Sequence, residues 1–161
     1  MTNKDRDDLC EEAPHWDTYQ IIIVAIYLTI GVLDAFVFQF STFLINYVHF
    51  IIPIILGATT FAIGVVFMYL AHKTVFEEVR DPPKVINWGV FRYVRHPMYF
   101  GTLLFYLAFV LFTFSLICLG LFIVICFIYN KFATYEEKQL ELKYNEKYIE
   151  YKNKTPKWIP H

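Results

Sequence analysis

Long apolar blocks alternate with short charged segments along the 161 residues of this chain. One block runs from about Tyr19 to Phe40 and a second from about Tyr47 to Ala71. Each block is long enough to cross a hydrocarbon core of roughly 30 Å, which takes a helix of about 20 residues. The pattern therefore predicts two membrane-spanning helices in the first half of the chain.

A third apolar block, from Pro97 to about Phe132, is too long for one comfortable span. As a single helix it would be roughly 50 Å long, because each residue adds about 1.5 Å. Two spans of about 17 residues each are barely adequate for a bilayer. The weak turn signal Thr113-Phe114-Ser115 marks the expected break. We therefore predict that the third and fourth membrane helices form a tight hairpin.

The distribution of Lys and Arg supports this count of helices. There are two before the first block, none between the first and second, five from Lys73 to Arg95 and seven from Lys131 onward. Basic segments tend to stay in the cytoplasm. The central loop and the tail share that side only if the third block crosses the membrane twice. The expected fold is an all-α integral membrane protein with about four transmembrane helices and both termini cytoplasmic.

The segment after Lys131 is polar but keeps a helical period. Its larger side chains recur at i, i+4, i+8 and i+11, namely Leu140, Tyr144, Tyr148 and Tyr151. This spacing places them on one face of a helix. The pattern predicts a cytoplasmic helical extension of the fourth membrane helix, which ends at Thr155-Pro156.

Composition agrees with a single membrane domain over residues 1–161. Hydrophobic residues make up 57% of the chain, whereas soluble domains have about 45–50%. An acidic segment, 1–18, precedes the first two membrane helices in 19–72, and it lacks the basic start of a cleaved signal peptide.

Gly57 and Gly64 are seven residues apart on roughly one helix face. They indicate either close helix packing or ordinary small-residue content.

Charge and metal-ligand spacing exclude two classes of partner. The net charge is only −1, so there is no electrostatic case for nucleic acid. The three cysteines have neither metal nor disulfide spacing, and the scattered histidines do not suggest a metal site. We expect membrane lipids as partners, with no nucleic acid and no metal.

A cationic cluster stands directly before the third apolar block, where Arg92, Arg95 and His96 are followed by Pro97. Charges in mid-bilayer cost roughly 2.5 to 3.5 kcal/mol on insertion scales. The cluster therefore either anchors the helix to lipid phosphates or binds a ligand. Pro97 suits the first turn of a helix. A position at a helix N-terminus favours a neutral His96.

Three acidic residues are candidates for function. Glu136 and Glu137 come about one turn after the fourth apolar segment. They form either a solvated helix face or a pair of carboxylates that meets a cationic or hydroxyl-rich ligand. Asp34 lies inside the first apolar block. An intramembrane acid is a functional candidate, although its place near the end of the block also allows exposure at the interface.

Two stretches taken together match a known pattern. Residues 85–91 (VINWGVF) and 95–101 (RHPMYFG) form the first, and residues 136–140 (EEKQL), with Tyr148-Ile149-Glu150-Tyr151 beyond them, form the second. This pair resembles the isoprenylcysteine carboxyl methyltransferase family, and related membrane phospholipid methyltransferases share much of it. The resemblance extends from about Lys84 to Pro160, and it is the spacing of both motifs across a hydrophobic hairpin that makes it specific.

The resemblance implies an S-adenosylmethionine site at the cytoplasmic membrane face, in a cofactor-binding core over residues 84–160. A site at this boundary lets a water-soluble cofactor and a lipophilic acceptor enter from different phases. By match, the cofactor-binding residues would be Val85, Ile86, Phe91, His96, Pro97, Met98, Tyr99 and Glu136. The residues that orient the substrate would be Arg95, Lys131, Phe132 and Glu137.

Two positions depart from the family pattern. Phe91 stands where Tyr is usual, and Phe132 stands where carboxyl methyltransferases carry an Arg for the acceptor carboxylate. Lys131 points about 100° away from that position on a helix. The leading hypothesis is isoprenylcysteine carboxyl O-methylation or a close relative. Phospholipid amine N-methylation, which does not need the Arg, is the nearest alternative.

Two further readings differ in kind. A sterol-type reductase would use NADPH, with Lys84 and Arg92 supplying charge for its phosphate. A non-enzymatic membrane scaffold would use the basic loop only as a lipid anchor.

Overall fold

The computed structural model describes residues 16–77 and 84–159, and these residues form helices and no strands. The main helices are α1 (Trp16–Val32), α2 (Ile51–His72), α3 (Pro97–Thr113), α4 (Leu116–Tyr144) and α5 (Glu146–Lys154). Two short π-helical segments, η2 (Leu33–Phe38) and η4 (Lys73–Glu77), extend α1 and α2. Two short 3-10 helices, η3 (Phe43–Tyr47) and η5 (Gly89–Arg92), complete the set. The predicted all-α class is confirmed for this part of the chain.

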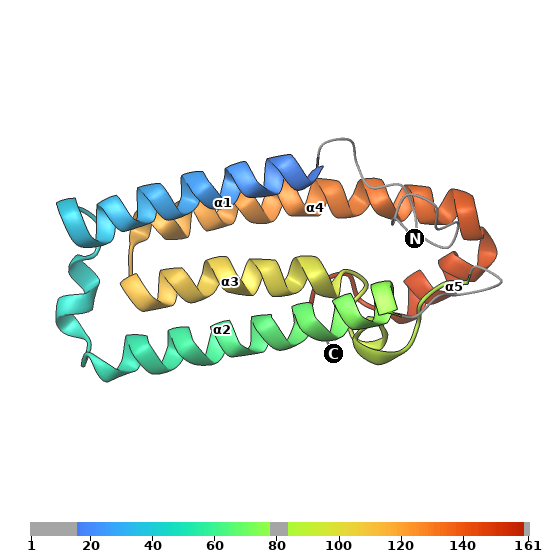
Figure 1. The fold of residues 1–161 in the computed structure, drawn as a ribbon, viewed down its shortest axis with the longest axis horizontal. Helices are drawn as coiled ribbons and strands as arrows, with labels where there is room; N and C mark the ends of the chain where they lie inside the picture. The colour runs from blue at the N-terminus through green and yellow to red at the C-terminus, as the bar shows by residue number, and fades with distance from the viewer. Residues whose placement is uncertain (1–15, 78–83, 160–161) are drawn as a thin grey trace.

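The helices form an elongated bundle in which α1 packs on α4, and α2 packs chiefly on α3 (Figure 1). A buried core joins α1, α3 and α4 through Tyr27, Tyr106 and Tyr129. The Tyr27 hydroxyl donates a hydrogen bond of 2.9 Å to the carbonyl of Tyr106. Helix α4 continues past the start of α3, and α5 folds back beneath the last part of α4 (Figure 1). This overhang places the second half of α4 beside the loop that precedes α3.

Three helices within the described residues are long and apolar enough to cross a membrane: Trp16–Phe38, Ile51–Phe76 and Leu116–Tyr144. Helix α3 is apolar but has 17 residues, near the lower limit for a span. A crossing by α3, and the side on which each terminus lies, remain predictions.

The bounds of the first two spans differ from those expected. The first span begins at Trp16, whose buried side chain packs into the core, and its wider last turn ends where Gln39 adopts a φ of 50°. The second begins at Ile51, because residues 43–47 form the separate helix η3 and Val48 is extended. Hydropathy could not separate these short turns from the spans because they are apolar too. Residues 1–15 of the acidic segment lie outside the described residues.

The break in the third apolar block falls where the sequence predicted it. Helix α3 ends at Thr113, Phe114 adopts a φ of 50°, and Ser115 is the N-cap of α4. The Ser115 hydroxyl accepts a hydrogen bond of 3.0 Å from the N–H of Cys118. This is the usual way a Ser satisfies a first-turn donor. Helices α3 and α4 then run in opposite directions (Figure 1).

The C-terminal extension is helical but not continuous, so that part of the prediction is wrong. Asn145, with φ 48° and ψ −129°, separates α4 from α5. Asn tolerates positive φ better than most residues. Tyr148 and Tyr151 on α5 are buried, whereas Leu140 and Tyr144 on α4 are half-buried. The four side chains that were expected on one face of a single helix therefore belong to two helices, α4 and α5.

Small residues allow α2 and α3 to approach closely. A Cβ added to Gly64 would lie 2.9 Å from the carbonyl oxygen of Gly101, and one added to Gly57 would lie 2.5 Å from the Phe112 ring. Contacts below 3.0 Å would force the helices apart. Of the two readings of Gly57 and Gly64, close packing is confirmed, and it fixes the position of α3.

Asp34 is 4% exposed and holds the turn between η2 and α4. Its carboxylate accepts hydrogen bonds of 2.5 Å from the hydroxyls of Ser41 and Ser115, and one of 3.0 Å from the N–H of Ser41. Exposure at the interface is therefore wrong for Asp34. We call Asp34, Ser41 and Ser115 the Asp34 corner.

Candidate active site between the start of α3 and the second half of α4

The start of α3 and the second half of α4 bring the two sequence motifs together. His96 is the N-cap of α3 and buried Pro97 occupies its first turn. Glu136 and Glu137 lie on α4, and Glu137 is 41 residues further along the chain than His96. Because α3 and α4 are antiparallel, these carboxylates return to the level of His96. We call Arg95, His96, Tyr99, Glu136 and Glu137 together the His96 cluster.

Both ring nitrogens of His96 face carboxylates. Nδ1 lies 3.5 Å from Oε2 of Glu136, and Nε2 lies 3.3 Å from Oε1 of Glu137. Burial alone would lower the pKa of His96, but the hydrogen bonds and charges of Glu136 and Glu137 outweigh it, so its pKa is raised. The arrangement favours the imidazolium and corrects the expectation of a neutral His96. Two nearby carboxylates outweigh the partial charge of a helix end.

Glu137 is the buried centre of a charge network. Nη1 of Arg95 lies 2.8 Å and Nζ of Lys152 lies 3.5 Å from its carboxylate oxygens. Lys152 also lies 2.6 Å from Oε1 of Glu141. Arg95 and Glu137 are thus engaged with each other. Sequence reasoning missed Lys152, because its contact depends on the break at Asn145.

Glu136 is the more accessible acid of the cluster. Its side chain is 19% exposed, whereas that of Glu137 is 5% exposed. Oε1 of Glu136 accepts a short hydrogen bond from the hydroxyl of Tyr99, and the Tyr99 ring stacks on His96. Tyr99 and His96 thus orient a carboxylate that still reaches solvent.

Aromatic side chains form the floor below the cluster. Trp16 of α1 stacks on Phe132 of α4 with ring centres 3.6 Å apart. It also meets the edges of Tyr99 and Tyr129 at 5.8 and 5.2 Å. Phe132 therefore lies under an indole ring. No pattern in the sequence indicates this contact, since a Trp at the start of a span ordinarily marks the membrane interface.

The C-terminal residues Thr155 to Ile159, which we call the strap, cross the cluster. The N–H of Arg95 donates a 3.0 Å hydrogen bond to the carbonyl of Pro156. Lys157 Nζ lies 2.7 Å from Thr134 Oγ1, and the Trp158 N–H donates to Asn130 Oδ1 at 3.1 Å. The Trp158 ring lies 5.9 Å from the His96 ring. An extended tail was predicted here, but not its return to α4.

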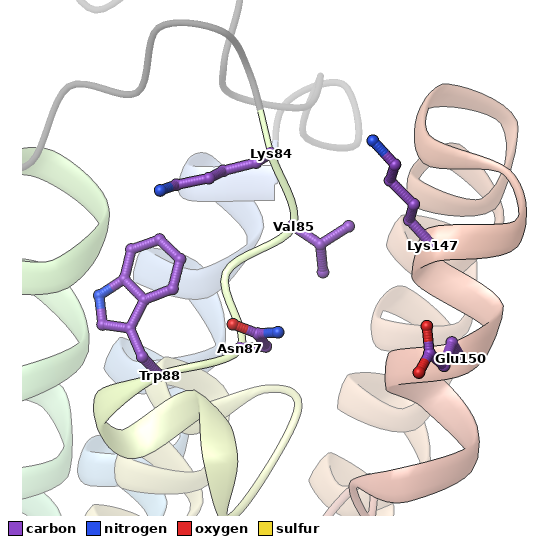
Figure 2. A pocket seen from close by; sticks show the side chains of 6 residues that line it. All are labelled: Lys84, Val85, Asn87, Trp88, Lys147 and Glu150. Atoms are coloured by element: carbon purple, nitrogen blue, oxygen red, sulfur yellow. The ribbon is translucent and has the colours of Figure 1, made fainter.

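Other predicted site residues lie outside the cluster. Val85 lines a separate cavity of about 340 Å³ between the loop before η5 and helix α5, shown in Figure 2 with Lys84, Asn87, Trp88, Lys147 and Glu150. Ile86, Phe91 and Met98 are half-buried, and Lys131 is exposed. The Phe91 carbonyl accepts a 2.6 Å hydrogen bond from the Tyr151 hydroxyl. Within the described residues, no three or more His, Cys, Asp or Glu are grouped as metal ligands.

Comparison with known proteins agrees with the motifs. Residues 43–147 match the family model described as phospholipid methyltransferase. A search of curated proteins and a search of solved structures each returned no match. The match covers more than half of the chain, both halves of the α3–α4 pair and the whole His96 cluster. The chain therefore belongs to the phospholipid methyltransferase family, a group of membrane methyltransferases.

Proposed function

We propose that this protein transfers a methyl group from S-adenosylmethionine to the amine headgroup of a membrane phospholipid. One observation carries the choice of acceptor. Where carboxyl methyltransferases present an Arg, α4 presents Phe132, which is stacked under Trp16. One turn further along α4 stands the partly exposed carboxylate of Glu136. A partly exposed carboxylate suits a cationic group.

The His96 cluster fits the cofactor chemically. The cofactor carries an amino group, a carboxylate and ribose hydroxyls, and Glu136 is a partly exposed acceptor for such donors. Arg95 Nε is a buried donor with no hydrogen-bond partner among the described residues, and a carboxylate would satisfy it. Glu136, His96 and Tyr99 would hold the cofactor's polar end, with Arg95 serving its carboxylate.

The charges of the cluster favour an amine over a carboxylate acceptor. Nη1 of Arg95 is already paired with Glu137 at 2.8 Å, and its Nε is assigned above to the carboxylate of the cofactor. Lys131 is exposed on another side of α4. A carboxylate acceptor would therefore be repelled by the negative charge of Glu136, with little neighbouring positive charge to offset the repulsion. An ammonium headgroup would be attracted to the same carboxylate.

The residues of the cluster supply positioning and a proton acceptor. The bound cofactor supplies a methyl group on a positively charged sulfur, which a neutral amine can attack. A phospholipid ammonium must first release a proton, and in this proposal the partly exposed carboxylate of Glu136 accepts it. Tyr99 and His96 fix the orientation of that carboxylate. The strap and the aromatic floor limit access of water, which strengthens these interactions.

Carboxyl O-methylation is the second candidate. The ammonium of Lys157 is held on Thr134 beside the cluster. Burial lowers the pKa of Lys157, and the charge of Glu137 opposes that effect only in part. A carboxylate acceptor would find a cation there in place of the Arg that α4 lacks.

Cofactor binding is tested by calorimetry with S-adenosylhomocysteine on the purified protein in detergent. We expect binding by the wild type and at least about tenfold weaker binding by Glu136→Gln, because a charge-assisted hydrogen bond contributes roughly 1.5 to 3 kcal/mol. Glu146→Gln is the matched control, since that carboxylate is exposed on α5. No binding by the wild type, or equal binding by Glu136→Gln, would contradict the proposed site.

The acceptor is tested with methyl-labelled cofactor and extracted membrane lipids. N-methylation leaves the label on the lipid after mild alkali, whereas a carboxyl methyl ester releases it as methanol. Alkali-stable label that runs with a phospholipid is expected. Alkali-labile label would support the second candidate instead.

A further inference from the structure

An apolar cavity of about 310 Å³ opens between α3, α4 and the strap. Four α3 side chains from Phe100 to Leu107 line it at i, i+3, i+4 and i+7, which is one helix face. Phe122 and Cys126 of α4 form the opposite wall. The cavity lies along two apolar helices, one of which is long enough to span a membrane.

The strap closes one end of this cavity, where Trp158 and Ile159 complete its lining. The indole N–H of Trp158 is held by Asn130, so the ring presents its apolar face to the cavity. The same ring lies 5.9 Å from the ring of His96. The apolar space thus runs from the middle of α3 and α4 up to the edge of the His96 cluster.

The size and chemistry of the cavity restrict its occupant. Its volume is at the lower end of the range of roughly 300 to 1,000 Å³ that is typical of ligand pockets. The Trp158 N–H is bonded outside the cavity, and the Cys126 thiol is only a weak donor. A flexible apolar chain fits such a space, whereas a charged headgroup would lose its hydration there.

We propose that this cavity holds one hydrocarbon chain of the lipid acceptor, and that Trp158 is a positioning residue that sets the depth of the headgroup beside His96. This inference rests on the proposed function, since it names the part of the acceptor that lies outside the reacting centre. One chain is bound in the protein, and the second stays in the surrounding lipid.

Filling the cavity tests the proposal through acceptor kinetics. Cys126→Phe adds a ring inside the cavity, whereas Val124→Phe puts the same ring on α4 at a side chain that is 54% exposed. With dipalmitoyl phosphatidylethanolamine in mixed micelles, Cys126→Phe should raise KM about tenfold, a usual effect of changed volume in an apolar pocket. With chainless glycerophosphoethanolamine, KM should stay as in wild type. An equal rise for both acceptors, or no rise for either, would overturn the proposal.

A second measurement separates this proposal from the proposed function. Phosphatidylethanolamine with brominated acyl chains should quench the Trp158 emission, obtained as the difference between wild type and Trp158→Phe. Cys126→Phe should remove that quenching, and Val124→Phe should retain it. Quenching without methyl transfer would leave the chain site standing and reject the reaction. Methyl transfer without quenching would reject the chain site alone.

Discussion

Among the described residues, each end of the bundle buries a carboxylate, and the two side chains are equally hidden from solvent. Asp34 and Glu137 are both 4% exposed. Asp34 lies at the end where α1 and α4 meet through the turn before α4, and Glu137 lies at the end where α4 meets α5 and the strap. Burial alone therefore does not separate a structural acid from a functional one.

The partners of the two acids differ in kind. Asp34 accepts from neutral hydroxyls and a backbone N–H, and the same hydroxyls accept from α4: Ile117 N–H donates to Ser41 Oγ, and Cys118 N–H donates to Ser115 Oγ. Both hydroxyls donate to Asp34, and the N–H groups of Ile117 and Cys118 in the first turn of α4 each donate to one of the two hydroxyl oxygens. Such a closed arrangement caps a helix and has no spare capacity for a ligand.

Glu137 is surrounded by ionisable groups instead. Arg95, His96 and Lys152 all lie within 3.5 Å of its carboxylate. The neighbouring Glu136 is partly exposed, and Arg95 Nε has no partner among the residues that the structure describes. An end with unused donors and an accessible acid can bind a polar ligand, whereas the Asp34 corner cannot.

The largest effect is expected from Glu137→Ala, which leaves Arg95 buried without its counter-charge. Removing one partner of a buried ion pair costs roughly 3 to 5 kcal/mol, measured here as the free energy of unfolding in detergent. The double variant Arg95→Met/Glu137→Leu should be more stable than the single variant, yet it should not bind S-adenosylhomocysteine. Equal stability of Glu137→Ala and wild type would show that the pair does not support the fold.

Asp34→Asn should lower the free energy of unfolding by about 1 to 3 kcal/mol, because it weakens charge-assisted hydrogen bonds to buried hydroxyls. The affinity for S-adenosylhomocysteine should stay within about twofold of wild type, as this corner is remote from the site. Asp17→Asn, at an exposed position of α1, is the control. Loss of cofactor binding in Asp34→Asn, with the fold retained, would contradict the division between the two ends.

A smaller effect should appear in the pH dependence of stability. The pKa of His96 is raised by Glu136 and Glu137 against the opposing effect of burial. Its stabilising contribution is therefore fully present below the ordinary His value of about 6.5 and is lost as pH rises through the raised value. From pH 6 upward, His96→Gln should flatten the plot of the free energy of unfolding against pH. Asp34→Asn should keep the slope of the wild-type plot. Parallel slopes for His96→Gln and wild type would rule out this assignment.

The smallest effect is expected from Lys152→Ala at the rim of the charge network. Its side chain is 37% exposed, and partly exposed ion pairs contribute about 0 to 1 kcal/mol. Unfolding in detergent should shift by no more than that amount, and less at high salt. A loss as large as that of Glu137→Ala would mean that Lys152, rather than Arg95, neutralises Glu137.

Much of the fold was predictable because hydropathy and turn chemistry act locally. The break at Thr113-Phe114-Ser115 follows from local polarity and turn chemistry, whereas at Gly57 and Gly64 the sequence left close packing and ordinary small-residue content both open. The break at Asn145 was not predictable, since the apolar and aromatic spacing from Leu140 to Tyr151 suits an uninterrupted helix. Tertiary packing of Tyr148 and Tyr151 outweighs that local pattern.

For the candidate site, the residue types could be predicted from the sequence better than the contacts between distant side chains. The two motifs indicated His96, Tyr99 and Glu136, and the structure brings these three together. The stacking of Trp16 on Phe132 and the return of the strap to Asn130 join residues that are over 20 positions apart. No local pattern encodes such contacts. The charge state of His96 likewise depended on Glu137, which sequence reasoning had assigned to the acceptor.

Helix α4 also makes the protein sensitive to bilayer thickness. It is an uninterrupted helix of 29 residues, about 43 Å long at roughly 1.5 Å per residue, with the Asp34 corner at one end and the His96 cluster towards the other. Its apolar part, from Leu116 to about Phe132, covers only about 25 Å at that rise, which is less than a hydrocarbon core of roughly 30 Å. Such a short stretch is expected to thin the bilayer around it or to draw the polar residues that follow towards the interface. Because only Phe114 and Ser115 separate α3 from α4, the 17-residue α3 shares this short apolar length. The height of the proposed site relative to the lipid is thus expected to follow hydrocarbon thickness, so that the proposed reaction would differ between membranes of different thickness.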